Sequence, residues 1–380
     1  MIRIVADHKI PFLKGALEGV ARVDYLPGGE ITRGDVMHAD AIITRTRTRC
    51  DRALLEGTGV KFIASATIGH DHIDADFCHE AGIEWTNAPG CNSSSVRQYV
   101  VSTLLYLAGL RGLELTGLTL GVVGVGNVGA KVAQAAKALG MKVLLNDPPR
   151  SRSEGQEGFV PLAVLLKNAD VVSLHVPLNH GGEDNTFQMV DARFVDQLKQ
   201  GAILINTSRG GVVSEVELIR GIKGGKITDA VLDVFLNEPE VNMELLDLLT
   251  LATPHIAGYS LDGKANGTGM AVRAVSRFFN LGMDTWEPDH ITPPGQNLLL
   301  GDAGSTGWLE LLRDIYLETY DVSRDDKRLR DNPGAFESLR GDYPLRREPS
   351  AYSVRLFQGY PEIVDIFEAL GFSVLADYCA

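Results

Sequence analysis

The sequence has few cysteines and lacks the motifs that would bind a structural metal. Its four cysteines, Cys50, Cys78, Cys91 and Cys379, lie far apart, no CxxC occurs, and no histidine stands at a metal-ligand spacing from them. We therefore expect neither a metal site nor a disulfide framework. Reduced thiols are typical of cytoplasmic proteins, and the cytoplasm is the expected location.

Long apolar runs and an excess of basic residues are also absent. The longest apolar stretch, YVVSTLLYLAGL at 99–110, is shorter than the roughly 20 residues that a membrane-spanning helix needs. MIRIVADHK is charged too early for a secretory signal. The chain carries 36 Lys and Arg against 49 Asp and Glu, a net charge of −13. We thus expect no membrane and no nucleic acid as partners, and any anionic ligand must be bound by a local group of residues.

What is present is an alternation of short apolar runs with amphipathic segments. From residue 1, the runs IRIVAD, AIITR, FIASAT and IEWTN are separated by PFLKGALEG, RALLEGTG and DADFCHEAG. Such alternation is typical of βαβ units on a parallel sheet, whose strands are covered on both faces. Residues 1–95 are therefore predicted to form one α/β domain, and Ser93–Ser95 to cap a long helix that starts just before Val96.

A second and more regular series occupies residues 96–258. Six apolar runs separated by helix-like segments fit a doubly wound nucleotide-binding fold of the Rossmann type: LTLGVVGVG, KVLLND, VVSLHVPL, AILINTS, DAVLDVF and LATPHIAG. A helical stretch from Asp262 to about Leu281 would then return to the first domain, which residues 259–285 complete. The last segment, 286–380, is domain-sized and holds the helix-like GWLELLRDIYLETY and YPEIVDIFEAL and the strand-like FSVLAD.

The strongest local signal is GVVGVGNVG, in which Gly124, Gly126 and Gly129 form GxGxxG between a strand and a helix. The first glycine permits a tight turn, the second lets the backbone approach a pyrophosphate, and the third lets the helix pack on the strand. Asp147 ends the next strand, where a carboxylate binds the ribose hydroxyls of NAD and repels a 2′-phosphate. NAD is the expected cofactor, while two nearby arginines leave NADP open: Arg150 and Arg152.

Three further stretches fall where strands of this domain should end: NTSRGG at 206–211, DVFLNEP at 233–239 and TPHIAGYS at 253–260. Strand ends of an open α/β sheet share one crevice, so Arg209, Glu238 and His255 could meet beside the cofactor. Arg209 offers a planar fork to a carboxylate, His255 can take a hydroxyl proton, and Glu238 would hold the imidazole. Taken singly, each has a structural alternative: a loop cap, a turn residue or a hydrogen-bonded histidine.

In this order GxGxxG, NTSRGG, DxFxxEP and PHIAG resemble the motifs of the D-isomer-specific 2-hydroxyacid dehydrogenases, over roughly the first three quarters of the chain. The resemblance implies an NAD-dependent oxidoreductase with a Rossmann domain, a flavodoxin-like substrate domain and the catalytic set Arg209, Glu238 and His255. It implies substrate contacts from Thr46, Thr67 and Tyr259. The implied cofactor contacts are Gly124, Gly126, Val128, Gly129, Asp147, Val176, Thr207, Ser208, Arg209, Asp233 and Gly258, and only a backbone contact can be carried over to Val176.

A narrower resemblance extends into the C-terminal segment. TPHIAGYSLDGKANGT, ATIGHDHID, YDVSRDDKRLR and YPLRREPSA are similar to the branch of this family that oxidises a small phosphorylated hydroxy acid. It implies a homodimer formed through an α+β domain at 286–380. A phosphoglycerate, glyoxylate or hydroxypyruvate dehydrogenase is the nearest alternative, and the C-terminal segment argues against the first because it lacks a compact alternation of strands and helices. An NAD-sensing interaction protein of the corepressor type is the alternative from another class.

The stretch AIITRTRTRC at 41–50 places three arginines among threonines: Arg45, Arg47 and Arg49. A strand that ends near Arg45, followed by a loop, would let Thr46 and one arginine face the substrate together and bind a phosphate. Arg346 and Arg347 are rival candidates for the phosphate, and solvated arginines on a strand edge are the alternative for each position. Three histidines are expected to be structural or surface residues: His70, nearest the substrate wall, His72 and His79.

Overall fold

The computed structural model describes residues 1–302, 307–357 and 361–377. The chain divides into two compact units. The first comprises Met1–Asn92 and Ser260–Thr292, and the second comprises Ser93–Tyr259 and Pro293–Ala380. The helix expected over 262–281 is α11, Leu261–Phe279, and it belongs to the first unit. The division into three domains, with a separate one at 286–380, stays a prediction.

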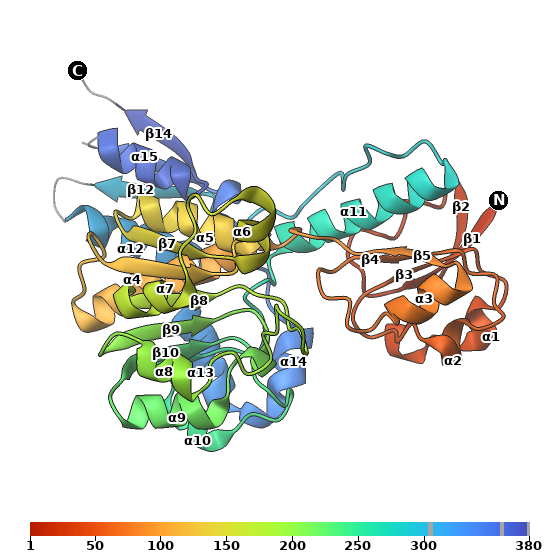
Figure 1. Cartoon of the computed structure of the whole chain (residues 1–380). Helices are drawn as coiled ribbons and strands as arrows, with labels where there is room; N and C mark the ends of the chain where they lie inside the picture. Colours follow the sequence, from red (N-terminus) through yellow and green to blue (C-terminus); the bar gives the residue numbers. More distant parts are fainter. Residues whose placement is uncertain (303–306, 358–360, 378–380) are drawn as a thin grey trace. The chain divides into compact units, whose positions relative to one another are not determined.

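The first unit is a parallel sheet with helices on both faces (Figure 1). Its strands are β1 Ile2–Asp7, β2 Ala21–Leu26, β3 Ala41–Thr44, β4 Phe62–Ser65 and β5 Glu84–Thr86, in the order β2-β1-β3-β4-β5. Side chains alternate along a strand, so Ile4 and Ile43 pack on α11. Val5 and Ile42 pack on the other face, with α1 Arg33–Val36, α2 Arg52–Leu55 and α3 Ala75–Ala81. The strand order is flavodoxin-like, as predicted.

Two expectations for the first unit are wrong. The amphipathic PFLKGALEG forms turns rather than a helix, because Phe12 and Gly15 have positive φ angles of 64° and 92° that a right-handed helix does not accept. ARVDYL, which was not expected to be a strand, forms β2 at the edge of the sheet. Exposed Arg22 and half-buried Asp24 interrupt the apolar run by which a fully buried strand is recognised.

The second unit contains a six-stranded parallel sheet, and each strand falls in a predicted apolar run. The strands are β6 Thr119–Val123, β7 Lys142–Asn146, β8 Val171–Leu174, β9 Ala202–Asn206, β10 Ile227–Leu232 and β11 Leu251–Ala252. Their order is β11-β10-β9-β8-β6-β7, so the winding direction reverses at β6 and β8. Doubly wound sheets bind ligands beyond the carboxyl ends of the strands at such a reversal, and the cofactor site is expected there.

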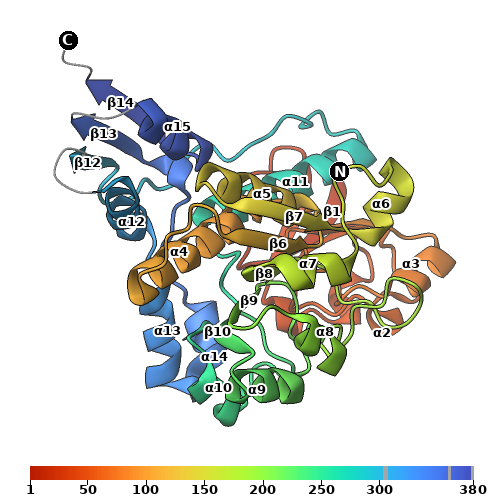
Figure 2. The ribbon, with the colours of Figure 1, turned by 60° about the vertical axis from the view of Figure 1, so that its left-hand side comes forward.

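Helices cover both faces of this six-stranded sheet (Figure 2). Leu120 and Ile205 pack on the side of α4 Ser93–Arg111 and α5 Asn127–Ala138. The opposite face is covered by α7 Leu162–Asn168, α8 Ala192–Gln197, α9 Glu215–Lys223 and α10 Met243–Leu248, and α6 Pro148–Glu154 follows β7. Helix α4 begins at Ser93, so the serines expected as its cap form its first turn instead.

The C-terminal segment carries more regular structure than was expected. The parallel strands β12 Leu298–Asp302, β13 Ser353–Phe357 and β14 Ser373–Asp377 form a sheet in that order. Helices α12 Trp308–Thr319 and α15 Pro361–Ala369, with β14, occupy the three expected segments. Strands β12 and β13 and helices α13 Val322–Asp331 and α14 Phe336–Gly341 were missed. The premise that this segment lacks an alternation of strands and helices is therefore wrong.

The apolar core of the C-terminal segment is continuous with that of the dinucleotide-binding fold. Buried Leu299, Tyr316 and Val354 belong to the same cluster as Leu104 of α4 and Val122 of β6. Because burial of apolar surface stabilises by about 25 cal/mol per Å², this shared core ties the segment energetically to the second unit.

The remaining helical elements are single 3-10 turns, at Gly28–Glu30, Gly210–Val212, Pro333–Ala335 and Pro349–Ala351. None of the helices in the described part of the chain combines the length and the apolar composition needed to cross a bilayer. Within the same residues, no three His, Cys, Asp or Glu side chains gather as a metal site would require.

Candidate active site

The loop between β6 and α5 has the geometry of a pyrophosphate cradle. Gly124 has φ +86°, and a Cβ added there would lie 2.6 Å from the carbonyl oxygen of His175. A Cβ at Gly129 would lie 2.0 Å from the carbonyl oxygen of Gly124, so the helix packs directly on the turn. A Cβ at Gly126, the N-cap of α5, would meet no atom within 4 Å. Each glycine thus meets the requirement predicted for it, and the open space at Gly126 fits a dinucleotide.

Asp147, directly after β7, lies against the same loop. Its Oδ2 accepts a hydrogen bond from the backbone N–H of Val125 at 2.8 Å, and its Oδ1 caps α6 through the N–H of Arg150 at 3.0 Å. The guanidinium of Arg150 pairs with Glu154, and Nη1 of Arg150 donates to the carbonyl oxygen of Val125. Arg152 pairs with acidic residues as well, at positions 183 and 184. Both arginines are therefore engaged by carboxylates, which favours NAD over NADP at this strand end.

The loop after β8 supports the cofactor side of the site. Burial lowers the pKa of His175 to about 3, so its imidazole is neutral. Its Nε2 lies 2.9 Å from Oγ of Ser173 and its Nδ1 lies 3.4 Å from Oγ1 of Thr207. A Cβ added at Gly124 would lie 2.9 Å from Cγ1 of Val176. An apolar side chain at 176 therefore packs on the glycine loop, and Val128, half-buried, lies in the first turn of α5.

The Arg209 loop is held by the last residue of β9. Oδ1 of Asn206 accepts hydrogen bonds from the N–H of Ser208 at 3.0 Å and its hydroxyl at 2.7 Å, and Nδ2 of Asn206 donates to the carbonyl oxygen of Arg209. A Cβ on Gly210 would lie only 1.9 Å from the carbonyl oxygen of Phe235. This contact explains the glycine after Arg209, because only a residue without a side chain lets the two loops approach so closely.

His255 and Glu238, which are 17 residues apart in the chain, form a direct pair. Nδ1 of His255 lies 2.7 Å from Oε2 of Glu238, and Oε1 of Glu238 accepts from the N–H of Phe235 at 3.0 Å. Burial alone would raise the pKa of Glu238, but these hydrogen bonds and the charges of His255 and Arg340 outweigh burial and lower the pKa. Glu238 is therefore an ionised acceptor, so Nδ1 of His255 carries the proton that it donates.

The backbone of His255 is held in an uncommon conformation. Its φ angle is +56°, in the left-handed region, and its N–H donates to the carbonyl oxygen of Asp233 at 2.8 Å. The carboxylate of Asp233 accepts three more hydrogen bonds, from the hydroxyl of Thr253 at 2.6 Å and from the N–H groups of Ile256 at 2.8 Å and Ala257 at 2.9 Å. Burial raises the pKa of Asp233 to about 6. Asp233 thus holds the backbone of the His255 loop in place, and we call this set of hydrogen bonds the clamp of the loop. This positioning role was not predicted from the sequence. The contact of Asp233 with NAD stays a prediction.

Gly258 and Tyr259 continue from this clamped loop. Oη of Tyr259 accepts a hydrogen bond from Nε of Arg340 at 2.8 Å, and the guanidinium carbon lies 5.7 Å from the centre of the tyrosine ring. Arg340, on α14, was not among the predicted site residues, and no motif or spacing in the sequence marks it. The structure therefore adds a cation from the C-terminal segment beside a residue predicted to bind substrate.

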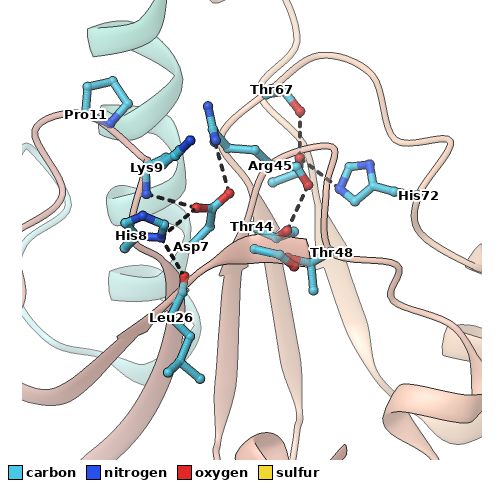
Figure 3. Close-up of polar contacts among 12 residues, drawn as sticks. Asp7, His8, Lys9, Pro11, Leu26, Thr44, Arg45, Thr48, Thr67 and His72 are labelled. Atoms are coloured by element: carbon cyan, nitrogen blue, oxygen red, sulfur yellow. Dashed lines mark hydrogen bonds and ion pairs between the residues drawn. The ribbon is translucent and has the colours of Figure 1, made fainter. Parts of the chain in front are cut away.

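In the first unit, polar side chains gather at the carboxyl ends of β1, β3 and β4 (Figure 3). Asp7, 1% exposed, accepts from the N–H of Lys9 at 2.9 Å, and its Oδ2 pairs with Nε of Arg45 at 3.1 Å. Strand β3 ends at Thr44, one residue before the expected end, and Thr46 is exposed in the following turn. The charge of Arg45 is therefore balanced by the carboxylate of Asp7, so Arg45 is less suited to be the main ligand of a phosphate.

Thr67 belongs to a second hydrogen-bonded group in this unit (Figure 3). Its Oγ1 lies 2.9 Å from Oγ of Ser65 and donates to the carbonyl oxygen of Gly69. Nε2 of His72 lies 3.4 Å from the same serine hydroxyl, and burial lowers the pKa of His72 to about 4. His72 is therefore neutral and structural, as expected. The other two histidines are exposed: His70, whose ring lies 5.1 Å from that of Trp85, and His79.

Two of the other proposed phosphate ligands have different surroundings. Arg49 is 85% exposed and pairs with Asp51. Arg346 is 5% exposed, and its guanidinium donates to Oε1 of Gln98 and to the carbonyl oxygens of residues 95, 256 and 257, over the ring of Tyr320. The suggestion that Arg346 binds phosphate is therefore wrong, because its hydrogen-bonding capacity is consumed by the fold. Arg347 is also buried, at 8% exposure.

Comparison with known protein families supports this arrangement. Residues 96–257 match the family described as D-isomer specific 2-hydroxyacid dehydrogenase, NAD binding domain, and residues 301–371 match a domain of unknown function. The NAD cofactor inferred from GxGxxG and Asp147 is confirmed by the first match. Among solved structures, a D-lactate dehydrogenase from Aquifex aeolicus complexed with NAD and lactic acid is 27% identical, with a TM-score of 0.61, and covers 73% of this chain and 95% of its own.

A 3-phosphoglycerate dehydrogenase from Entamoeba histolytica with bound NAD+ is 25% identical, with a TM-score of 0.62, and covers 77% of this chain and 99% of its own. About a quarter of this chain therefore has no counterpart in these structures. Curated relatives instead match nearly the full length. The erythronate-4-phosphate dehydrogenase of Bacteroides fragilis (strain YCH46) is 48% identical over 355 residues, 93% of this chain and 99% of the relative.

The enzyme of the same name from Pseudomonas putida (strain W619) is 41% identical over 377 residues, 97% of this chain and 98% of the relative. The phosphoglycerate, glyoxylate or hydroxypyruvate type and the NAD-sensing interaction protein are not favoured by these matches. The chain therefore belongs to the erythronate-4-phosphate dehydrogenases, an NAD-dependent branch of the D-isomer-specific 2-hydroxyacid dehydrogenase family.

Proposed function

We propose that this chain oxidises the C2 hydroxyl of 4-phospho-D-erythronate to give 3-hydroxy-2-oxo-4-phosphooxybutanoate, a step in the synthesis of pyridoxal 5′-phosphate. The observation that carries the reaction class is the 2.7 Å pair of His255 and Glu238 beside the Arg209 loop, in the unit that holds the dinucleotide cradle. The name of the full-length relatives supports the choice of substrate.

His255 is the general base in this proposal. Since its Nδ1–H is donated to Glu238, the lone pair of Nε2 is the atom that takes the C2 hydroxyl proton. The imidazolium that results is stabilised by the carboxylate of Glu238, whose lowered pKa keeps it ionised at neutral pH. The left-handed backbone at His255 and the clamp of Asp233 fix the direction in which the imidazole points.

Arg209 takes the C1 carboxylate of the substrate. Its planar guanidinium can form two parallel hydrogen bonds to that group and orient C2 toward His255. NAD, when bound, would supply the acceptor for the hydride of C2. Asp147 would hold the ribose hydroxyls of NAD, and Thr207, Ser208, Asp233 and Gly258 would line the cofactor.

The first unit contributes the substrate contacts predicted for it. Thr46 in the turn after β3 and Thr67 after β4 supply hydroxyl groups at the carboxyl ends of adjacent strands. Tyr259 supplies a third hydroxyl from the second unit. These are neutral hydrogen-bonding groups, so the double charge of a phosphate needs a cation in addition.

The protein acts as a homodimer in this proposal, through the sheet of β12, β13 and β14. One face of that sheet packs on α12 and α15 through Leu299, Val354 and Leu356. The other face exposes large apolar side chains: Leu300 at 61%, Phe357 at 42% and Leu375 at 42%. Leu300 and Leu375 flank Arg355 in register, so they form one patch that a second copy can cover. The cytoplasmic location also stays a prediction.

The test compares the oxidation of 4-phosphoerythronate with that of erythronate and 3-phosphoglycerate. Turnover is followed as NADH formation and, with a 2-oxo acid added to reoxidise any retained NADH, as reduction of that acid. Turnover that strongly prefers 4-phosphoerythronate supports the assignment. A preference for 3-phosphoglycerate would contradict the substrate but leave the catalytic set intact. NAD binding without turnover of any hydroxy acid would favour an NAD-sensing protein instead.

A further inference from the structure

Arg340 lies near the proposed catalytic residues but belongs to none of the dehydrogenase motifs found in the sequence. It lies on α14 of the C-terminal segment, 81 residues from Tyr259, to whose hydroxyl its Nε donates at 2.8 Å. Tyr259 follows the loop that Asp233 clamps around His255. The charge of Arg340 also acts on the carboxylate of Glu238. The guanidinium therefore lies on the same side of the unit as the His255–Glu238 pair.

The hydrogen-bonding capacity of Arg340 is mostly unused. A guanidinium has five N–H donors, and among residues 1–302, 307–357 and 361–377 only the Nε–H of Arg340 has an acceptor. The side chain is half-buried, and no ion pair of Arg340 is found among these same residues, although the charges of Glu238 and Glu337 act on it. A partly desolvated cation with four open donors is costly unless an anion or water completes it.

Arg346, six positions along the same segment, shows what a structural arginine looks like here. It is buried, and its Nε, Nη1 and Nη2 all donate to acceptors of the protein. The contrast indicates that the open donors of Arg340 are available to a ligand.

The chemistry of the substrate identifies that ligand. Under the proposed function, on which this inference rests, the substrate has two anionic groups, and Arg209 takes the carboxylate. We propose that Arg340 binds the phosphate group of the substrate and is the residue that makes the enzyme prefer a phosphorylated hydroxy acid. A guanidinium binds phosphate through two parallel charge-assisted hydrogen bonds, and the hydroxyl of Tyr259, held by Nε, fixes the plane of the fork.

Arg340 lies in the C-terminal segment, outside residues 96–257 that match the NAD-binding domain of the family. The D-lactate and 3-phosphoglycerate dehydrogenase structures cover 73% and 77% of this chain, whereas the erythronate-4-phosphate dehydrogenases cover 93% or more. The remaining quarter of the chain is roughly the size of the segment from Pro293 onward, which carries Arg340. The added segment therefore supplies a cation to the site of a more widespread catalytic fold.

The experiment compares Arg340→Gln and Arg340→Lys with the wild type on 4-phosphoerythronate and on erythronate. We expect kcat/KM for 4-phosphoerythronate to fall roughly 10- to 100-fold in Arg340→Gln, mainly through KM, and kcat/KM for erythronate to stay within about twofold. Arg340→Lys should recover part of the loss. Inorganic phosphate, used as a competitive probe, should inhibit the wild type and lose potency by a similar factor in Arg340→Gln.

Arg328→Gln is the matched control, because Arg328 also faces a tyrosine ring in this segment, that of Tyr343 at 5.9 Å, and pairs with Asp325. It should leave the ratio of the two kcat/KM values unchanged. An equal fall of kcat/KM on both substrates in Arg340→Gln would show that Arg340 only positions Tyr259. Unchanged kcat/KM values on both substrates would place the phosphate elsewhere, and either result overturns the proposal. If Arg45→Gln abolishes the preference instead, the phosphate lies in the first unit.

Failure of the wild type to oxidise 4-phosphoerythronate would be a failure of the proposed function. The phosphate probe would still decide whether Arg340 binds an anion. Equal affinity of wild type and Arg340→Gln for inorganic phosphate, measured directly by calorimetry, would then refute the site.

Discussion

Replacing Glu238 by glutamine removes the charge beside His255 while keeping a side chain of equal length that can accept the hydrogen bond from Nδ1. The variant therefore isolates the electrostatic part of the 2.7 Å pair. Two unit charges about 4 Å apart interact by about 4 kcal/mol at an effective dielectric constant of about 20. The side chains of His255 and Glu238 are 28% and 18% exposed, so we halve this figure for solvent screening, to about 2 kcal/mol.

That energy acts when His255 becomes an imidazolium, so it lowers the barrier of proton transfer. A loss of about 2 kcal/mol corresponds to roughly a 30-fold fall in kcat, with the Kd for NAD unchanged. His255→Ala, which removes the base itself, should cost more, roughly 10²- to 10⁴-fold. The assay is steady-state NADH formation, with NAD affinity measured separately by fluorescence.

The pH dependence gives a second readout of the same pair. Although burial opposes it, the hydrogen bonds to Glu238 and the charges of His255 and Arg340 lower the pKa of Glu238. The stabilisation from its ionised form is therefore fully present above the ordinary pKa of a glutamate and is lost only as the pH falls through the lowered pKa. We expect the advantage of wild type over Glu238→Gln to persist across neutral pH. Glu240→Gln, an exposed change in the same loop, is the control. A Glu238→Gln variant that turns over within threefold of wild type would refute the electrostatic role.

Three further predictions concern the supporting structure. The pKa of Asp233 is raised from 3.8 to about 6, so the folded state holds this proton more tightly than the unfolded chain does. The free energy of unfolding should therefore fall as the pH rises from about 4 to about 6. Asp233→Asn should flatten that slope when the free energy of unfolding is measured by urea titration at each pH. Gly126→Ala should keep the melting temperature but weaken NAD binding, whereas Gly129→Ala should lower the melting temperature, because its Cβ would lie 2.0 Å from a carbonyl oxygen; a reversed pattern in calorimetry would contradict the cradle geometry. Leu300→Glu should convert a dimer to monomers in sedimentation equilibrium, and an unchanged mass would show that the exposed face of β12 is not the interface.

The strands and the catalytic loops were predictable because their signals are local. A buried parallel strand reads as a continuous apolar run, and the residues at the carboxyl ends of β9 and β10 follow such runs directly. The same logic failed for β2, where Arg22 and Asp24 interrupt the run. It also failed for β12 and β13, which lie in a stretch rich in charged and loop-forming residues.

Contacts between distant positions could not be predicted in the same way. Arg45 and Asp7 are 38 residues apart, and their pairing changes the interpretation of TRTRTR from an open anion site to a partly neutralised one. The clamp of Asp233 on the His255 loop depends on backbone N–H groups, which leave no mark in the pattern of side chains. Arg340 reaches Tyr259 only because α14 packs in the second unit.

The continuous core that joins the C-terminal segment to the dinucleotide-binding fold bears on how such an enzyme can change its substrate. Leu299 and Tyr316 share that core with Val122, one strand position before the end of β6. A related dehydrogenase of shorter length cannot gain the contact of Arg340 by a point substitution, since the helix that carries it must be built onto the sheet first. The contact between Arg340 and Tyr259 is in this sense gained or lost together with a whole folded segment.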